Sequence, residues 1–256
     1  MKNRLTSIAI VCLVVIAGFF GFISFESGVV SAGNVWYVGS GPGNHSTTIQ
    51  GGINLASDGD TVFVYSGTYI ENVGVDKMIN LIGEERDATI IDGGGVLSVV
   101  YISANWVNIT GFTITNGGKG IDIQGSSNKT ISNNSVSNCV RGIVAQDSLN
   151  NIIANNSISN NDVGIYVRDS SDIKITDNNF VNDGIVISGS ELKHFNSHTI
   201  PDNNMVNGKP LYYYKDTSGI SIDSIPVGEL ILANCTDVIV KNIQIDKTDI
   251  FEQRSF

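Results

Sequence analysis

The side chains of this chain that could bind or transform a ligand recur at a fixed interval. Gln124, Gln146 and Arg168 are each 22 residues apart. Asp122 and Tyr166 lie two residues before the first and the last of them and are 44 apart. This spacing indicates a polar strip of amides, a guanidinium, a carboxylate and a phenol. One repeated element of secondary structure must position these groups.

Asp122 is the candidate catalytic residue of this strip. A glycosidase needs two carboxylates roughly 5–10 Å apart on an exposed surface, and Asp122 is the only carboxylate in the repeated positions. A lyase would use a basic residue beside an acidic cluster that binds calcium. Arg141 and Arg168 are available, but no such cluster accompanies them. The chemistry therefore favours a site that binds over a site that cleaves.

Copper would need His, Met or Cys side chains grouped together. His194 and His198 are four residues apart, with Met205 nearby, so the two histidines are candidate metal ligands. They lie in an irregular segment, where histidines are usually only polar loop residues. We therefore predict no cofactor and keep copper or calcium as the alternatives.

A sugar-binding groove needs aromatic faces with polar neighbours. The residues that could form one are Tyr166, Arg168, Gln124, Gln146, Tyr212 and Tyr214. The simpler interpretation is that these tyrosines belong to strands, in which successive side chains alternate between the core and the surface. Trp36 and Trp106 are expected to pack at the end of the fold and at a corner.

A repeat of 22 residues must position these side chains. The clearest column of the repeat consists of Ile109, Ile131, Ile153 and Ile175. Each unit holds three short groups of alternating apolar residues, separated by turn-forming Asp, Asn, Ser and Gly. Three strands per unit, stacked at about 4.8 Å, describe one coil of a right-handed parallel β-helix. Residues 48–56 predict a short helix that caps its N-terminal end.

The repeat also assigns side chains to the inside and the outside of the coils. The predicted inward columns are Val99, Ile121, Ile143, Ile165 and Ile185, and Tyr101, Ile123, Ala145, Val167 and Ile187. The predicted outward columns are Val100, Asp122, Val144, Tyr166 and Val186, and Ile102, Gln124, Gln146, Arg168 and Ser188.

Two columns of asparagine occupy the predicted corners. Asn116, Asn138, Asn160 and Asn182 are each 22 apart. Asparagine tolerates the left-handed backbone of a tight corner, and stacked amides bond to one another, so these four are expected to form a ladder. A second column contains Asn134, Asn156 and Asn178.

The chain divides into five predicted segments. Residues 1–32 combine basic residues, an apolar run and a small-residue cleavage site, which predicts a signal peptide, with an uncleaved anchor as the alternative. Residues 33–95 form a cap and irregular first coils, and residues 96–190 form the regular coils. Residues 191–228 form an irregular coil with an outward excursion, and residues 229–256 begin a further coil of a longer solenoid.

Export and charge limit the partners of the protein. The signal peptide predicts a secreted or cell-surface location, with membrane contact only through the N-terminal segment or a missing C-terminal part. The formal net charge of −10 argues against nucleic acid and disfavours polyanions unless calcium bridges the two. Sequons for N-glycosylation occur at Asn44, Asn108, Asn128, Asn133, Asn155 and Asn234. Cys139 and Cys235 lie several coils apart and are expected to be free thiols.

At this point the sequence resembles a known family. The segment WYVGSGPGNHSTTIQGGINLASDGDTVFVYSGTYIENVGVDKMINLIGE is similar to the N-terminal part of secreted pectin-lyase-like proteins. The repeated units, and the segment HTIPDNNMVNGKPLYYYKD with the residues that follow it, resemble NosD-like proteins of the archaeal cell-surface type. The resemblance implies an exported β-helix, often described as carbohydrate-binding, whose namesake is tied to copper delivery.

These observations favour an exported, non-catalytic binding or structural module, with glycans or other surface proteins as partners. A polysaccharide lyase or glycosidase is the first alternative, and a NosD-like copper-handling protein is the second.

Overall fold

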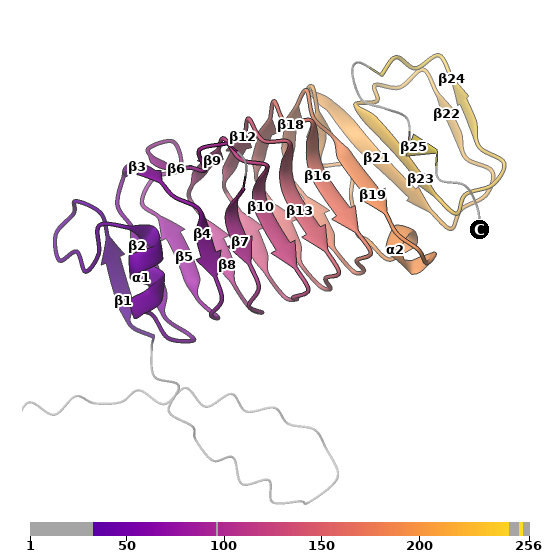
Figure 1. Cartoon of the computed structure of the whole chain (residues 1–256). Coiled ribbons are helices and arrows are strands. Elements are labelled where there is room, and N and C mark those ends of the chain that lie inside the picture. Colours follow the sequence, from indigo (N-terminus) through magenta and orange to yellow (C-terminus); the bar gives the residue numbers. More distant parts are fainter. Residues whose placement is uncertain (1–32, 96, 246–250, 253–256) are drawn as a thin grey trace, which may run out of the picture. The chain divides into compact units, whose positions relative to one another are not determined.

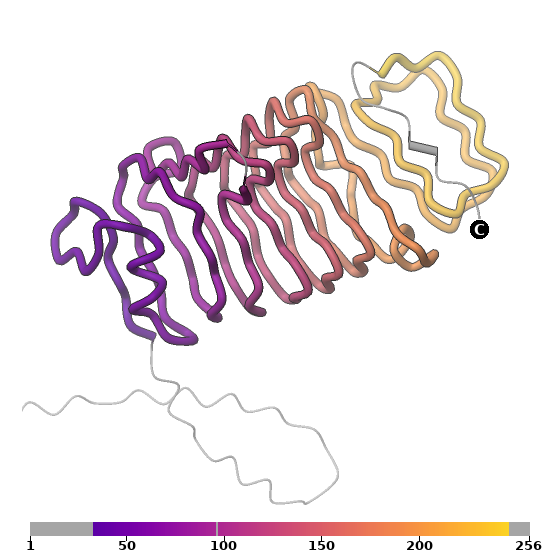
Figure 2. The backbone as a smooth tube through the Cα atoms, in the orientation of Figure 1, coloured from indigo at the N-terminus to yellow at the C-terminus, as the bar shows by residue number. Residues whose placement is uncertain are grey.

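The computed structural model describes residues 33–95, 97–245 and 251–252. These residues form a right-handed parallel β-helix, in which the chain winds through three sheets that we call A, B and C (Figures 1 and 2). The predicted signal peptide at 1–32 lies outside the described residues. Within them, no helix has the length and apolar character that crossing a membrane requires.

From β2 to β19, each coil contributes one strand to each sheet, and the strands within a sheet follow the order of the coils. Sheet A contains β1 (Val35–Val38), β2 (Thr61–Val64), β5 (Asn80–Gly83), β8 (Asn108–Thr110), β11 (Thr130–Ser132), β14 (Ile152–Ala154) and β17 (Lys174–Thr176). Sheet C contains β4 (Val73–Val75), β7 (Ser98–Ile102), β10 (Lys119–Gln124), β13 (Arg141–Gln146), β16 (Val163–Arg168) and β19 (Ile185–Ser188).

Sheet B extends beyond the other two. It contains β3 (Gly67–Ile70), β6 (Thr89–Asp92), β9 (Thr113–Thr115), β12 (Ser135–Ser137), β15 (Ser157–Ser159), β18 (Asn179–Val181), β20 (Met205–Val206), β21 (Lys209–Lys215), β23 (Glu229–Ala233) and β25 (Phe251–Glu252). A separate two-stranded sheet contains β22 (Ser221–Asp223) and β24 (Ile239–Lys241).

Stacked β-branched side chains fill the inside of the coils. Ile109, Ile131, Ile153 and Ile175 pair in register along sheet A and have no exposed surface. Such residues have few rotamers to lose on burial and pack closely in a narrow core. The structure therefore confirms the fold class and this column of the repeat.

The register of β7 differs from the prediction by one residue. Val100 pairs with Ile121, and Tyr101 pairs with Asp122, so Tyr101 faces outward and is exposed. Val100 and Ile102, predicted outward, are fully buried. The turn before β7 causes this shift, because it is longer than the corresponding turn of the next coil. Ile91 and Val100 are nine residues apart, whereas Ile114 and Ile121, their partners in the next coil, are seven apart.

The continuous asparagine ladder is the second predicted column. The Nδ2 of Asn134 donates to Asn156 Oδ1 at 3.3 Å, the Nδ2 of Asn156 to Asn178 Oδ1 at 3.0 Å, and the Nδ2 of Asn178 to Asn204 Oδ1 at 3.1 Å. All four residues are buried, and each amide also bonds backbone groups of the turn. This ladder satisfies buried polar groups that would otherwise destabilise the corner.

The first predicted column forms the corner without forming a ladder. Asn116, Asn138, Asn160 and Asn182 have φ between 56° and 59°, as expected for left-handed corners. Their side chains are exposed, and only Asn182 and Asn160 bond to each other, at 3.4 Å. Water competes for exposed amides, which explains why the buried column holds the ladder.

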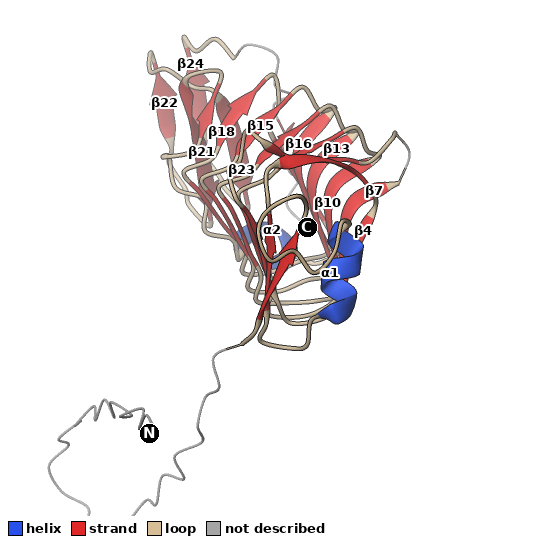
Figure 3. Cartoon of the chain, turned by 90° about the vertical axis from the view of Figure 1, so that its left-hand side faces the viewer, coloured by secondary structure: helices blue, strands red, loops and turns tan. Residues whose placement is uncertain are grey.

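Helix α1 (Ile49–Leu55) covers the N-terminal end of the coils, as predicted, and Figure 3 shows it beside β4. Thr48 caps it by accepting a hydrogen bond from a backbone N–H of the first turn. The amide of Gln50 bonds both the N–H and the carbonyl of Gly74, so it replaces a missing neighbouring strand. Lys77 Nζ donates to carbonyls at the C-terminal end of the helix. The helix thus satisfies the open edge of β4.

The C-terminal coils are built differently. Strands β20 and β21 form an antiparallel hairpin, and β21 and β23 continue sheet B while sheets A and C end at β17 and β19. Both faces of β23 are covered, because Ile231 faces the main core and Leu230 faces a second cluster that includes Ile222. Helix α2 (Lys193–Asn196) follows β19.

Candidate functional site

Parallel pairing along sheet C brings the candidate residues into two outward columns. One column runs from Gly74 through Tyr101, Asp122, Val144 and Tyr166 to Val186. Beside it lie Gln124, Gln146, Arg168 and Ser188. Four of the six predicted ligand-binding residues therefore share one face, together with Asp122.

Asp122 lies at the centre of this face and is almost completely buried, with 3% of its surface exposed. Its Oδ2 accepts hydrogen bonds from Lys119 Nζ at 2.8 Å and from Ser98 Oγ at 2.9 Å. Its Oδ1 is also buried and has no hydrogen-bond partner among the described residues. A buried acceptor without a donor costs free energy, and the ion pair with Lys119 and the hydrogen bond from Ser98 offset that cost.

Arg141 lies on the adjacent strand with its guanidinium held over an aromatic ring. The Cζ atom is 4.7 Å from the ring centroid of Tyr166, a cation–π distance. The Tyr166 hydroxyl in turn accepts from Ser188 Oγ at 3.0 Å. No described group accepts a hydrogen bond from the guanidinium. The guanidinium is therefore oriented and keeps its donors for an acceptor outside the chain.

Two adjoining hollows open beside these residues. One, of about 310 Å³, is lined by Leu97, Ser98, Gly118, Lys119, Val140 and Arg141. The other, of about 290 Å³, is lined by Asn72, Val73, Gly74, Leu97, Ser98 and Tyr101. Leu97 is 65% exposed and Val140 is 53% exposed, so apolar and aromatic surface borders the charged groups. We call the two hollows together the sheet C groove. Asp122 does not line it, but it binds Lys119 and Ser98, which do.

The remaining predicted residues of this face have other partners or lie at its edge. Arg168 Nε contacts Asp169 Oδ2 at 3.3 Å, and Gln146 Nε2 donates to Asp147 Oδ2 at 3.1 Å. Both aspartates have a left-handed backbone at the corner, which agrees with a turn role. Gln124 is exposed.

The predicted tyrosines Tyr212 and Tyr214 lie apart from the sheet C groove. They belong to β21 of sheet B and stack on each other at 6.3 Å between ring centroids. They also pack against the second core cluster. A hollow of about 240 Å³ beside them is lined with Ile200, Pro201 and Asp202. The two tyrosines therefore do not complete a site with Tyr166.

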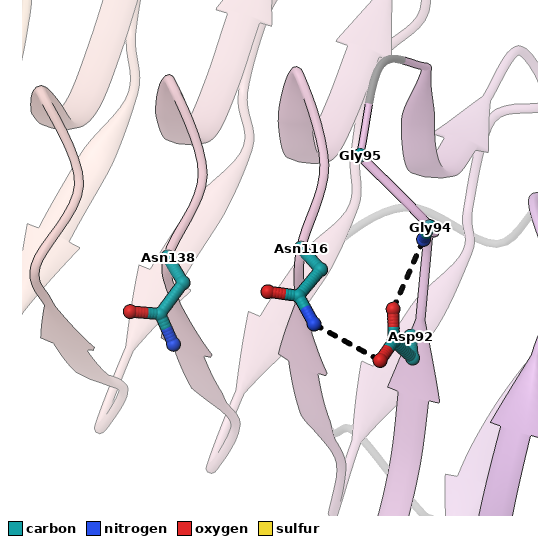
Figure 4. Close-up of a pocket in the computed structure, with 5 residues that line it drawn as sticks. All are labelled: Asp92, Gly94, Gly95, Asn116 and Asn138. Carbon is teal, nitrogen blue, oxygen red and sulfur yellow. Dashed lines mark hydrogen bonds between the residues drawn. The ribbon is translucent and has the colours of Figure 1, made fainter.

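A further hollow, of about 440 Å³, lies at the corner of the long turn before β7 (Figure 4). Asp92 lines this hollow. Its Oδ1 accepts a hydrogen bond from Gly94 N at 3.0 Å, and its Oδ2 accepts one from Asn116 Nδ2 at 2.9 Å. Figure 4 shows both oxygens directed at these partners. The carboxylate therefore holds the turn and the corner together.

The two candidate copper ligands, His194 and His198, are hydrogen-bonded to backbone groups. The Nδ1 of His198 accepts from Ile173 N at 3.3 Å, and its Nε2 lies 2.9 Å from the carbonyl of His194. Burial lowers the pKa of His198. The Nδ1 of His194 accepts from Ser190 N and Glu191 N, both at 3.3 Å. Both ring nitrogens of His198 are occupied, which disagrees with a role as metal ligand.

The donor set elsewhere does not fit copper either. No group of three or more His, Cys, Asp or Glu side chains that could hold a metal ion occurs in the described part of the chain. Cys139 and Cys235 are free thiols, and Cys139 is buried.

Sequence reasoning did not predict the residues that line the sheet C groove, among them Lys119, Ser98 and Tyr101. Lys119 lies 22 residues before Arg141, so the repeat could have revealed it. Ser98 and Tyr101 were hidden by the register shift of β7, which no periodic pattern shows.

Residues 53–225 match the family described as periplasmic copper-binding protein (NosD), which is about two thirds of the chain. No match was found among curated proteins. Among solved structures, an alginate lyase from Paenibacillus sp. str. FPU-7 is 14% identical with a TM-score of 0.54, covering 82% of this chain and 99% of that one. The ORF18 protein of Geobacillus virus E2 is 14% identical with a TM-score of 0.51, covering 76% of this chain and 56% of that one. At this identity the likeness concerns the fold alone, and the chain spans little more than half of the viral protein.

Proposed function

The chain belongs to the NosD family, a periplasmic β-helix family, and on that premise we propose that it works outside the cytoplasm as a non-catalytic module that binds glycans. The single observation that carries the proposal is the Arg141 guanidinium, which lines the sheet C groove and lies over the ring of Tyr166. A carboxylate, sulfate or hydroxyl oxygen of a glycan is the acceptor that such a guanidinium binds.

The surroundings of Asp122 suit a glycan with an acidic group. The guanidinium of Arg141 lies over the ring of Tyr166, and a planar fork of donors matches a carboxylate or sulfate. Tyr101, Leu97 and Val140 offer apolar surface to the C–H faces of sugar rings. Sugar-binding sites combine these features in an open groove.

The same geometry argues against cleavage. Glycoside hydrolysis uses a pair of carboxylates, whereas Asp122 is the single carboxylate of the outward columns. Its charge is already neutralised by Lys119 at 2.8 Å. A carboxylate held in an ion pair is a fixed acceptor, which serves binding better than proton transfer.

Titration calorimetry with neutral and acidic oligosaccharides tests the proposal. We expect binding without release of reducing ends or unsaturated uronates. Arg141→Ala removes a charged donor, and the affinity is expected to fall by about 10-fold to 100-fold, as for a lost hydrogen bond to a charged group. Lys174→Ala at an exposed position of sheet A is the matched control and should bind like the wild type.

Three results would contradict the proposal. The first is an unchanged affinity in Arg141→Ala, when circular dichroism shows the variant folded. The second is product release that Asp122→Asn abolishes, which would establish the polysaccharide-cleaving alternative. The third is stoichiometric copper that His194→Ala and His198→Ala remove, which would establish metal handling instead.

A further inference from the structure

Trp106 occupies a corner where its side chain stabilises nothing that the structure shows. It is 61% exposed and has a φ of 59°. A packing role was predicted for it, and the exposure shows that this prediction is wrong. A bulky residue with positive φ is a true outlier, because its Cβ crowds the backbone.

The repeat supplies an internal comparison for this corner. The same position of the next three coils holds Asn128, Asn150 and Asp172, with φ of 61°, 55° and 57°. The backbone pattern is also shared: Trp106 N donates to Ser127 O as Asn128 N donates to the equivalent carbonyl one coil further on. Asn and Asp tolerate this conformation and Trp does not. A strained, exposed residue of this kind indicates a role outside folding.

The sequence two residues further on suggests that role. Asn108 begins β8 with an exposed side chain and forms a glycosylation sequon with Thr110. Of the six sequons in the chain, this is the one with an aromatic residue at either of the two positions before the asparagine. The C–H face of a pyranose packs well on an indole, because the ring is large, apolar and rigid.

We propose that Asn108 carries an N-linked glycan whose first sugar stacks on the indole of Trp106. The reaction requires a lipid-phosphate-linked oligosaccharide and the transferase of the exporting cell. The Nδ2 of Asn108 bonds to the anomeric carbon, the carbon–oxygen bond to the lipid phosphate breaks, one amide proton leaves, and the lipid phosphate is the leaving group.

The surroundings of Asn108 are compatible with this modification. Its Nδ2 donates to Asn80 Oδ1 at 2.7 Å, and a glycosylated amide keeps one N–H for this bond. Other sequons are less suited: Asn128 is half-buried, and none of the other sequon asparagines follows an aromatic residue by one or two positions. The glycan would cover the indole and offset the strain at the corner.

The first test is glycopeptide mass spectrometry of the protein purified from its native cells. We expect Asn108 to be occupied, and the Trp106→Asn variant made in the same cells to show at least twofold lower occupancy there. The sequon at Asn133, far from any tryptophan in sequence, is the internal control and should not change between the two. Unmodified Asn108 in the native protein would overturn the proposal, as would an occupancy that Trp106→Asn leaves unchanged.

The second test separates stacking from strain. In protein made without glycosylation, Trp106→Asn relieves the backbone, and the Tm is expected to rise by about 2–4 °C. In glycosylated protein the same change removes the stacked sugar, and the Tm of the occupied fraction is expected to fall. An equal shift in both forms would show that the glycan and the indole do not interact. Quenching of Trp106 fluorescence by free oligosaccharide, with Asn108 bare in native protein, would assign the indole to an external glycan and overturn the proposal.

Discussion

Glu229 gives the fold a stability that depends on pH. Its side chain is almost completely buried, and both carboxylate oxygens lie 3.1 Å from the backbone nitrogen of Ile185, the first residue of β19. One coil earlier, the equivalent residue is Ile165, and its backbone N–H donates to the carbonyl of Gly184 in the next coil. Sheet C ends at β19, so the Glu229 carboxyl substitutes for the missing strand.

Burial raises the pKa of Glu229 from 4.5 to about 8, and the single N–H of Ile185 offsets this only in part. The folded state therefore holds a proton that the unfolded chain releases near pH 4.5. Stability contributed by this group is full below pH 4.5, falls as the pH rises toward about 8, and is constant above it. A difference of roughly 3.5 pKa units corresponds to a loss on the order of 5 kcal/mol.

Glu229→Gln isolates this contribution, because the amide has the same shape, accepts from Ile185 and does not ionise. Urea unfolding followed by circular dichroism at pH 4, 7 and 9 measures it. We expect the variant and the wild type to have similar free energies of unfolding at pH 4, and the variant to be more stable by several kcal/mol at pH 9. The difference between the two curves is the readout, since all other groups titrate alike in both.

Glu191→Gln is the control on the surface. Lys193 lies 2.9 Å from the Glu191 carboxylate and lowers its pKa. Glu191→Gln keeps Glu229, so its free energy of unfolding should fall between pH 7 and pH 9 as it does in the wild type. Parallel stability curves for Glu229→Gln and the wild type would show that Glu229 is ionised at no cost, and would refute the reasoning.

Two further predictions concern buried polar groups. Asn156→Ala removes the acceptor of Asn134 N and the donor to Ile131 O, so it should lower the free energy of unfolding by about 3 kcal/mol. Asn155→Gly, at the exposed left-handed corner, should change the free energy of unfolding by less than about 1 kcal/mol. Equal losses for the two variants in urea unfolding would contradict the role of the ladder. Lys129 is fully buried with one bond of 3.4 Å to Ser127 O, and burial lowers its pKa to about 8. Because the folded state rejects the proton, wild-type stability should rise as the pH increases from 8 toward 10.5. Lys129→Met should remove this rise and be more stable at pH 7 by about 2 kcal/mol, and a less stable Lys129→Met at pH 7 would contradict it.

The repeat made the fold predictable because identical side chains must stack. The isoleucines at 109, 131, 153 and 175 keep both their spacing and their burial. The glycines at the second position of β10, β13 and β16 are explained by backbone contact. A Cβ on Gly142 would lie 2.5 Å from the carbonyl oxygen of Gly164. Only glycine fits at these positions, so the repeated glycines in the sequence indicate where the backbones of adjacent coils are in contact.

The candidate site was predicted in part. Asp122, Gln124, Gln146, Tyr166 and Arg168 lie on one face because the repeat fixes their columns. The position of β7 was missed because adjacent Val99 and Val100 both suit a buried strand, so hydrophobicity cannot report a turn that is two residues longer. Tyr101 consequently faces the groove instead of the core.

Interactions that cross between coils explain the other misses. The sequence shows that His194 and His198 are close, but not that the backbone occupies both ring nitrogens of His198. It likewise does not show which asparagine column is shielded from water, and that decides which column forms the ladder.

The charge of the sheet C groove reverses one conclusion drawn from composition. A formal net charge of −10 disfavours acidic ligands when it is treated as a uniform surface. Charges in salt solution act only over about 8–10 Å, so a ligand in the groove responds mainly to the groups beside it. There, Lys119 neutralises Asp122 at 2.8 Å and Arg141 is left with its charge and its donors. The groove is therefore locally basic, and the acidic glycan that we propose as its ligand would need no calcium bridge.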